Sequence, residues 1–148
     1  EASRTAPARV IPTGTVTIPW SIGAAARAAN DIIEVCKVPA GAIITDIFVN
    51  TSVGHANLKV DAGTIYTDSA DASQDDIDSL IDDAALVVAT PVARPGKDSL
   101  VPFTVPASAK SDCTVKLKIL AHNATGDWKG FVTYTFQTAE RFVPSADQ

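Results

Sequence analysis

The chain has 148 residues, 46% of them hydrophobic and 20% charged, with 17 acidic and 12 basic residues and a net charge of −5. This composition is typical of one folded domain and argues against disorder, while the short apolar runs argue against a membrane-spanning helix. The basic residues are scattered and form no patch that would bind phosphate, so we expect no direct contact with nucleic acid.

The first twelve residues, EASRTAPARVIP, contain two prolines and follow neither a helical nor a strand period. We expect them to form an extended N-terminal arm. The next segment, TGTVTIPW, alternates Val16, Ile18 and Trp20 with threonines, which predicts a half-buried strand ending at Pro19. GAAARAAN, at 23–30, fits either a helical turn or a loop.

Residues 31–50, DIIEVCKVPAGAIITDIFVN, predict two strands joined at Pro39-Ala40-Gly41. Both strands carry apolar residues on each face, which is typical of strands covered on both sides. The predicted faces are Ile33 and Val35 against Ile32, Cys36 and Val38 in the first strand, and Ile43, Ile47 and Val49 against Ile44 and Phe48 in the second. We therefore expect this chain or a partner to cover the second face.

Five further segments favour strands, and Gly63 in the first of them indicates a bulge. They are ANLKVDAGTIYT, LVVATPV, LVPFTV, DCTVKLKILAH and GFVTYTF. About eight short strands separated by turns predict an all-β, two-sheet sandwich with jelly-roll or Greek-key connections. The expected organisation is an arm at 1–12, a sandwich at 13–138 and an irregular tail at 139–148.

The acidic segment 68–85, DSADASQDDIDSLIDDAA, holds seven aspartates and no base. A calcium loop fits it poorly, because Asp76 stands where an EF-hand needs glycine and Asp82 where it needs glutamate. A short helix fits better. Ser73 is a suitable N-cap, the following acids suit the helix dipole, and Ile77, Leu80 and Ile81 form one apolar stripe.

The two cysteines, Cys36 and Cys113, lie 77 positions apart and form no CxxC pair. Two interpretations stay open at this point: buried free thiols, or one disulfide between two strands. A zinc site would need clustered ligands that this sequence does not supply.

No motif in the sequence supports catalysis. His55 and His122 stand in no nucleophile motif, there is no P-loop, and only three glutamates are present. We therefore expect a protein that is not an enzyme and that carries no cofactor or metal. Trp20 and Trp128 are candidates for an exposed platform that would bind sugar, although tryptophan is more often packed in a core or at its rim.

The series DIIEVCKVPAGAIITDIFVN, LKVDAGTIYTDSAD and ATGDWKGFVTYTF, spanning 31–136, resembles the jelly-roll capsid decoration (cement) proteins of tailed bacteriophages. The resemblance implies a virion protein on the outer capsid surface that is assembled in the host cytoplasm. It further implies a homotrimer that binds major capsid subunits and stabilises the shell, and it carries over no catalytic residue.

The contact residues are a physical inference, since a terminal arm has little reason to order on an isolated domain but can cross a neighbouring subunit. The expected partner-binding residues are Arg4, Arg9, Val10, Ile11 and Trp20, with Arg141, Phe142 and Val143 in the tail. The alternatives are a phage tail or head-fibre subunit, a carbohydrate-binding module, or a β-sandwich hydrolase with a polar pocket.

Overall fold

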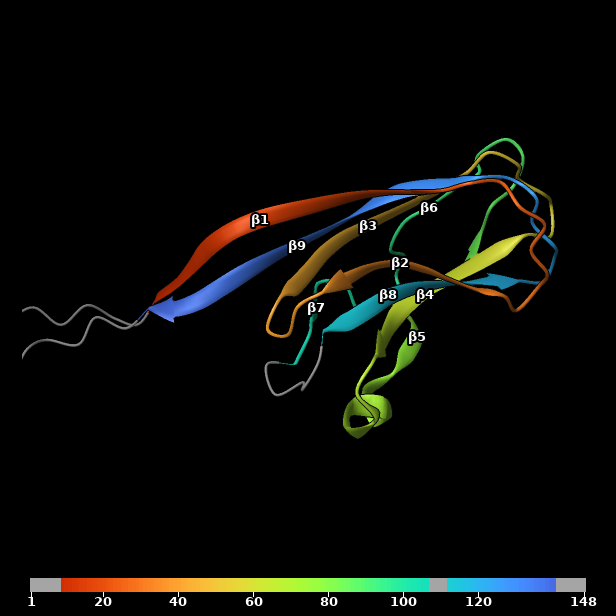
Figure 1. Ribbon diagram of the computed structural model, residues 1–148. Helices are drawn as coiled ribbons and strands as arrows, with labels where there is room; N and C mark the ends of the chain where they lie inside the picture. The colour runs from red at the N-terminus through yellow and green to blue at the C-terminus, as the bar shows by residue number, and fades with distance from the viewer. Residues whose placement is uncertain (1–8, 107–111, 141–148) are drawn as a thin grey trace, which may run out of the picture.

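The computed structural model describes the backbone of residues 9–106 and 112–140, and the side chains of residues 14–106 and 112–136. Within these ranges the chain forms two β-sheets that face each other (Figure 1). The strands are β1 (Arg9–Ile22), β2 (Ile32–Val38), β3 (Ile43–Thr51), β4 (Lys59–Tyr66), β5 (Asp76–Ala85), β6 (Val92–Ala93), β7 (Phe103–Thr104), β8 (Cys113–Leu120) and β9 (Trp128–Glu140). One 3-10 helix, η1, spans Ser69–Gln74.

The strand order is that of a jelly roll. One sheet has the order β1-β9-β3-β6, with β7 also paired to β3, and the other has the order β2-β8-β4-β5. The antiparallel pairs are nested: β1 pairs with β9, β2 with β8, β3 with β6, and β4 with β5. This arrangement confirms the predicted two-sheet sandwich with jelly-roll connections.

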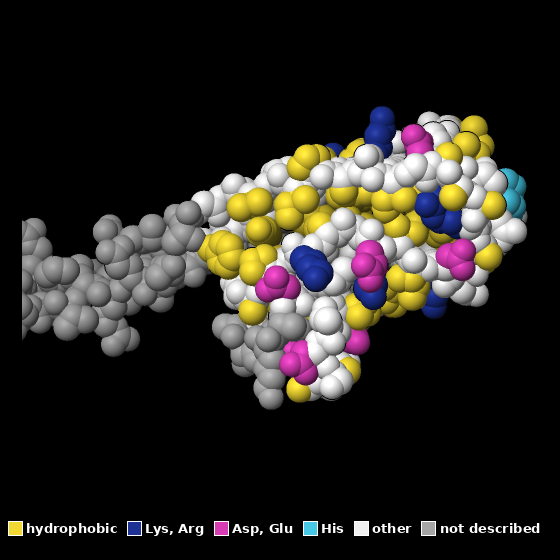
Figure 2. Space-filling view, in the orientation of Figure 1, with side chains coloured by type: hydrophobic (Ala, Val, Ile, Leu, Met, Phe, Trp, Pro, Cys, Tyr) yellow, Lys and Arg dark blue, Asp and Glu magenta, His cyan; other side chains and the backbone are white. Residues whose placement is uncertain are grey.

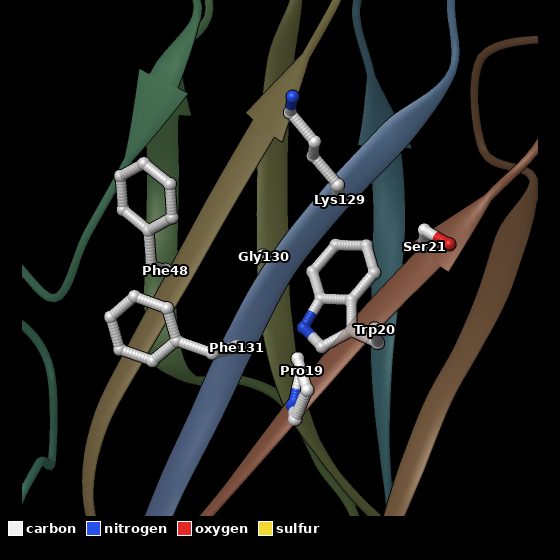
Figure 3. Close-up of a pocket in the computed structure, with 7 residues that line it drawn as sticks. All are labelled: Pro19, Trp20, Ser21, Phe48, Lys129, Gly130 and Phe131. Carbon is white, nitrogen blue, oxygen red and sulfur yellow. The ribbon is translucent and has the colours of Figure 1, made fainter.

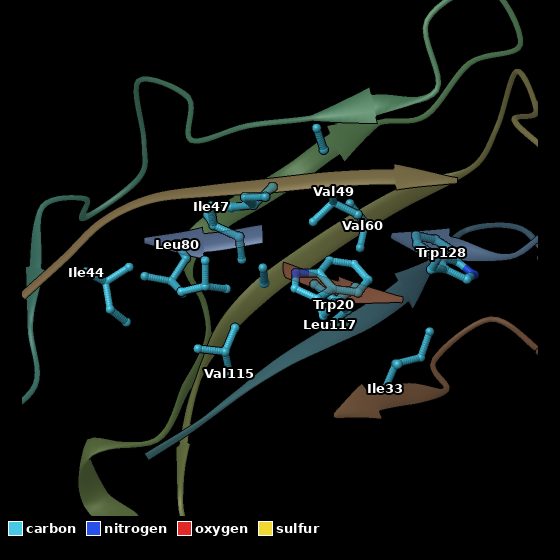
Figure 4. Close-up of a cluster of buried hydrophobic side chains, with 14 of the residues drawn as sticks. Trp20, Ile33, Ile44, Ile47, Val49, Val60, Leu80, Val115, Leu117 and Trp128 are labelled. Carbon is cyan, nitrogen blue, oxygen red and sulfur yellow. The ribbon is translucent and has the colours of Figure 1, made fainter. Parts of the chain in front are cut away.

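The core lies between the two sheets and draws side chains from both (Figure 4). Its fully buried members include Ile44, Ile47, Leu117 and Trp128. The segment 31–50 does form two strands, but β2 and β3 lie in different sheets, and the turn at Pro39–Ala42 carries the chain across. The described part of the chain does not cover the second face of β2, where Ile32 is 55% exposed, so cover of that face by a partner stays a prediction.

The predicted faces of β2 and β3 also need correction, for one shared reason. Each strand has a register shift, between Glu34 and Cys36 in β2 and between Ile44 and Asp46 in β3. An extra residue at a bulge reverses the alternation beyond it. Buried residues therefore come from both predicted faces: Ile33 with Val38 in β2, and Ile44 with Ile47 and Val49 in β3.

The helix predicted around Ser73 is wrong. Residues 76–85 form β5, which pairs with β4, and the only helical turn nearby is η1, whose N-cap is Asp68. The apolar residues that suggested a helical stripe are buried instead by pairing with β4, where Ile81 lies opposite Ala62. Register shifts on both sides of Ala62 allow Ser79, Leu80 and Ile81 to be buried in succession, a pattern that regular alternation does not give.

Three weaker predictions resolve into loops and short strands. Segment 23–30 is a loop with one bridge between Arg27 and Ala124. Within 86–92 and 100–105, only Val92 and Phe103–Thr104 belong to strands. β1 continues past Pro19 to Ile22, which is possible because β1 is an edge strand and tolerates a missing N–H donor.

The described residues include no helix with the length and apolar character that a membrane span requires.

The ends of β1 and β9 project beyond the sandwich as a two-stranded ribbon (Figure 1). The last pair between β3 and β9 is Ile43 with Thr135, whereas Arg9–Gly14 and Phe136–Glu140 continue to pair only with each other. Residues 9–12, placed in the arm by the sequence, thus begin β1. Two strands without further support are marginally stable in water, so this ribbon is suited to gaining support from another chain.

A glycine at position 63 permits the close approach of β4 and β5. A Cβ atom there would overlap backbone atoms of Asp76 and Ile77. We expect Gly63→Ala to lower the free energy of unfolding by about 1–3 kcal/mol, because the two strands must separate to admit the methyl group. Denaturant unfolding measures the change. The matched control is Gly23→Ala, where no atom lies within 4 Å of the added Cβ, and equal stability of both variants would contradict the prediction.

Candidate interaction surface

Three apolar side chains form a row across the outer face of the five-stranded sheet. Pro19 of β1 lies opposite Phe131 of β9, which lies opposite Phe48 of β3 (Figure 3). The two phenyl rings are nearly parallel, with centroids 5.5 Å apart. We call these three residues the aromatic row. The adjacent positions on this face are polar, with Thr17, Thr133 and Asp46 on one side and Ser21, Lys129 and Asn50 on the other.

A shallow depression of about 550 Å3 lies beside the aromatic row. Its lining residues are Pro19, Trp20, Ser21, Phe48, Lys129, Gly130 and Phe131 (Figure 3). Trp20 belongs to the core and also lines the depression. It can do both because Gly130 has no side chain that would separate the Trp20 ring from the depression. A Cβ atom at position 130 would lie 2.9 Å from Cζ2 of Trp20 and would overlap the carbonyl oxygen of Phe48.

The aromatic row is flanked by positive charge. The guanidinium carbon of Arg94 lies 4.6 Å from the ring centroid of Phe48 and 5.9 Å from that of Phe131. Arg94 also forms an exposed ion pair with Asp46 at 3.4 Å. Lys129 is exposed and takes part in none of the ion pairs among the described residues. Aromatic side chains combined with arginine are the composition enriched at the centre of protein interfaces.

The residues expected from the sequence to bind a partner lie mostly elsewhere. Trp20 lines the depression, whereas Arg9, Val10 and Ile11 lie on the projecting part of β1. Arg4, Arg141, Phe142 and Val143 fall outside the described residues. The binding role of all these residues stays a prediction. Sequence reasoning missed Phe131, Arg94 and Lys129 as surface candidates, since only the pairing of β1, β9 and β3 brings the aromatic row together.

The two histidines, which stand in no nucleophile motif, meet at one end of the sandwich. The rings of His55 and His122 stack with centroids 3.6 Å apart and planes 12° apart. Figure 2 shows them at the end opposite the ribbon. His55 Nδ1 accepts a hydrogen bond from the backbone N–H of Asn57, and His122 Nδ1 donates one to the carbonyl of Asn123. Within the described ranges, no group of three His, Cys, Asp or Glu side chains is arranged to hold a metal.

The exposed tryptophan platform required for the carbohydrate-binding interpretation is absent from the part of the chain that the structure describes. Trp128 is completely buried, and Trp20 is only 9% exposed. Their indole Nε1 groups are both enclosed and without a hydrogen-bond partner. These tryptophans are therefore core residues, the alternative that the usual burial of tryptophan favours.

The cysteines are free thiols, which resolves the two interpretations left open by the sequence. Both lie at the pairing of β2 with β8, where Cys36 is opposite Val115 and Cys113 is opposite Val38. Burial raises the pKa of Cys36 to about 11. Burial, followed by the nearby Cys36, raises the pKa of Cys113 to about 12. Thiols with such pKa values are poor nucleophiles at neutral pH.

The acidic stretch forms the edge of the other sheet. The carboxyl groups of Asp76 and Asp78 share a hydrogen bond, and this contact, with lesser contributions from burial and nearby acids, raises the pKa of Asp78 to about 6. Burial also raises the pKa of Asp61 on β4, although its carboxylate accepts a hydrogen bond from the backbone N–H of Asp83 at 2.7 Å. Carboxylates are concentrated along this edge. Lys59 pairs with Asp83 there, and Lys118 lies near Asp61.

No family model and no curated protein sequence matches this chain. Its fold does match chains in three solved structures. The first is from the capsid of Ralstonia phage GP4, with TM-score 0.66, 18% identity, and 93% of each chain covered. The second is from the Cyanophage Pam1 capsid asymmetric unit, with TM-score 0.63, 16% identity, and 92% of this chain and 94% of that chain covered. The third is from the acidic stable capsid structure of Helicobacter pylori bacteriophage KHP30, with TM-score 0.57, 12% identity, and 90% of this chain and 100% of that chain covered. At these identities the likeness establishes a shared fold.

The raised thiol pKa values predict slow chemical labelling. At pH 8 only about 0.1% of a thiol with a pKa near 11 is ionised, so we expect a thiol-specific reagent such as DTNB to modify the native protein slowly. Labelling of both cysteines should become complete in denaturant. Fast labelling of either thiol in the native protein would contradict the described burial.

The contact between Asp76 and Asp78 predicts a pH-dependent stability. The pKa of Asp78 is raised on folding, so the folded state holds the proton more tightly, and this group lowers stability progressively as pH rises from about 4 through about 6. We expect Asp78→Asn to raise the melting temperature at pH 7.5, with the gain shrinking toward pH 4. Asp98→Asn, at an exposed site beside Lys97, is the charge-matched control. A gain that is independent of pH would refute this account.

Proposed function

We propose that this chain is a structural protein of a phage virion that decorates the outer capsid surface and stabilises the shell by binding major capsid subunits. One observation carries the proposal. The fold matches chains of three different phage capsid structures over at least 90% of this chain and at least 93% of each matched chain. The matches are therefore to whole chains of about this size within capsids, and not to a module inside a larger protein.

The described residues also suit a protein that acts by binding. The core is filled from both sheets, and the aromatic row lies on an open face and not in a polar cleft. The Nδ1 atoms of the stacked histidines bond to backbone groups of neighbouring residues, whereas a catalytic histidine is oriented by an acid. An enzyme of the hydrolase class would need a pocket with convergent polar groups, and the depression near Trp20 is mostly apolar.

The ribbon is the proposed attachment to the shell. Its strands have free edges, since Arg9–Gly14 and Phe136–Glu140 pair only with each other. A neighbouring subunit can extend the ribbon by strand addition to the free edge of β9 at Phe136–Glu140, since Pro12 interrupts the ladder on the β1 side. In this proposal Arg4, Arg9, Val10 and Ile11 contact the major capsid protein, and Arg141 and Phe142 are further contact residues. The decorating unit is a homotrimer.

The attachment is tested by removing residues 1–12 and measuring cosedimentation with empty shells built from the major capsid protein of the same phage. The truncated chain should stay folded, because residues 9–12 pair only with residues 137–140, but it should no longer sediment with the shells. Circular dichroism and melting temperature monitor the fold.

The binding control is Lys97→Ala, which changes an exposed loop residue and should leave sedimentation unchanged. Equal sedimentation of the truncated chain would overturn the role of the ribbon. Failure of the full-length chain to bind shells would overturn the decoration function itself.

A further inference from the structure

We propose that copies of this chain associate head to tail, with the aromatic row and its flanking cations on one copy receiving the acidic β5 edge of the next. The inference deepens the self-association included in the proposed function, because it names the two surfaces that meet. It rests on the apolar and charged groups that each surface displays.

The receiving surface is apolar at its centre and positive at its margin. Phe48 and Phe131 are only half buried, although the rest of this face carries mainly threonine, serine and other polar side chains. Arg94 and Lys129 flank the row, and Lys129 has no acidic partner among the described residues. Arg94 is already paired with Asp46 at 3.4 Å, so Lys129 supplies the uncompensated positive charge beside the row. Such a surface attracts an acidic partner that also offers an apolar side chain.

The β5 edge offers those groups. Asp76 Oδ1 accepts a hydrogen bond from the backbone N–H of Asp78 at 3.4 Å, and neither carboxylate takes part in the ion pairs among the described residues. Leu100 is 54% exposed, and its backbone N–H donates to the carbonyl of Ser79, the residue after Asp78, at 2.8 Å, which places Leu100 next to β5. The exposed leucine can fill the depression while the adjacent carboxylates reach Lys129 and Arg94.

The same segment prevents a different mode of association at this edge. Leu100 N–H and the hydroxyl of Ser99 bond to the backbone carbonyls of Ser79 and Leu80, at 2.8 Å in each case. These carbonyls are therefore already satisfied, which disfavours addition of another strand here. Recognition of the β5 edge then depends on its side chains.

The two surfaces lie on different sheets of the sandwich, since the aromatic row belongs to β1, β9 and β3, and the acidic edge to β5. A contact between two different surfaces of identical chains is heterologous, and it generates a closed ring when the rotation between copies closes. A ring of three copies would agree with the proposed homotrimer. A glycan is a less suitable occupant of the aromatic row, because the Arg94 guanidinium already lies over the Phe48 ring.

The test is a charge exchange followed by light scattering of the purified protein without shells. Lys129→Glu should weaken association at least about tenfold, since it places a carboxylate opposite Asp76 and Asp78. Adding Asp78→Lys to the same chain should restore the oligomer, because every copy then carries both exchanged charges. The matched control is Lys37→Glu, which changes another exposed lysine, on β2, that also lacks an acidic partner among the described residues. It should remain oligomeric.

A monomeric wild-type protein, or a Lys129→Glu variant that associates like the wild type, would overturn the inference. If Asp78→Lys does not restore association of the Lys129→Glu variant, the assignment of the β5 edge is overturned. Binding to empty shells is measured separately. If the wild type is monomeric and Lys129→Glu loses shell binding, the aromatic row faces the shell, so the self-association fails while the decoration function stands.

Discussion

The pairing of β1 with β9 joins the beginning and end of the sandwich along the whole described length of both strands. β9 also pairs with β3, so it is the central strand on which the five-stranded sheet is built. The nested pairs of the jelly roll follow from this closure: with the first and last strands together, each inner strand meets its counterpart from the other half of the chain. The aromatic row spans β1, β9 and β3, and the projecting ribbon continues β1 and β9 beyond the end of β3.

The alternation of apolar residues allowed the fold class to be predicted, because strands such as β8 keep a regular period from Cys113 to Ile119. Alternation could not give the faces of β2 and β3, since a bulge adds one residue without a distinctive sequence pattern. The prediction of a helix around Ser73 was wrong for a related reason. Ile77, Leu80 and Ile81 fit a helical stripe locally, but pairing with β4 buries Leu80 and Ile81 as part of a bulged strand.

The candidate surface was less predictable than the fold. Phe48 and Phe131 are 83 positions apart, and only the register of β3 with β9 makes them neighbours. The stacking of His55 and His122 likewise joins two loops that the sequence gives no reason to connect. Trp20 was expected to contact a partner and does line the depression, yet it is mostly a core residue. A single sequence contains the residues of such surfaces, but their juxtaposition is a property of strand order.

The prolines of β1 have a consequence for the proposed arrangement of many copies on one shell. A free edge strand invites further chains to pair with it, and crowding on a lattice would favour uncontrolled growth of that sheet. β1 contains Pro12 and Pro19, and each removes a backbone donor that a continuous ladder would require. Neighbouring copies can therefore lie close together without fusing into one extended β-structure, and their contacts remain specific and finite.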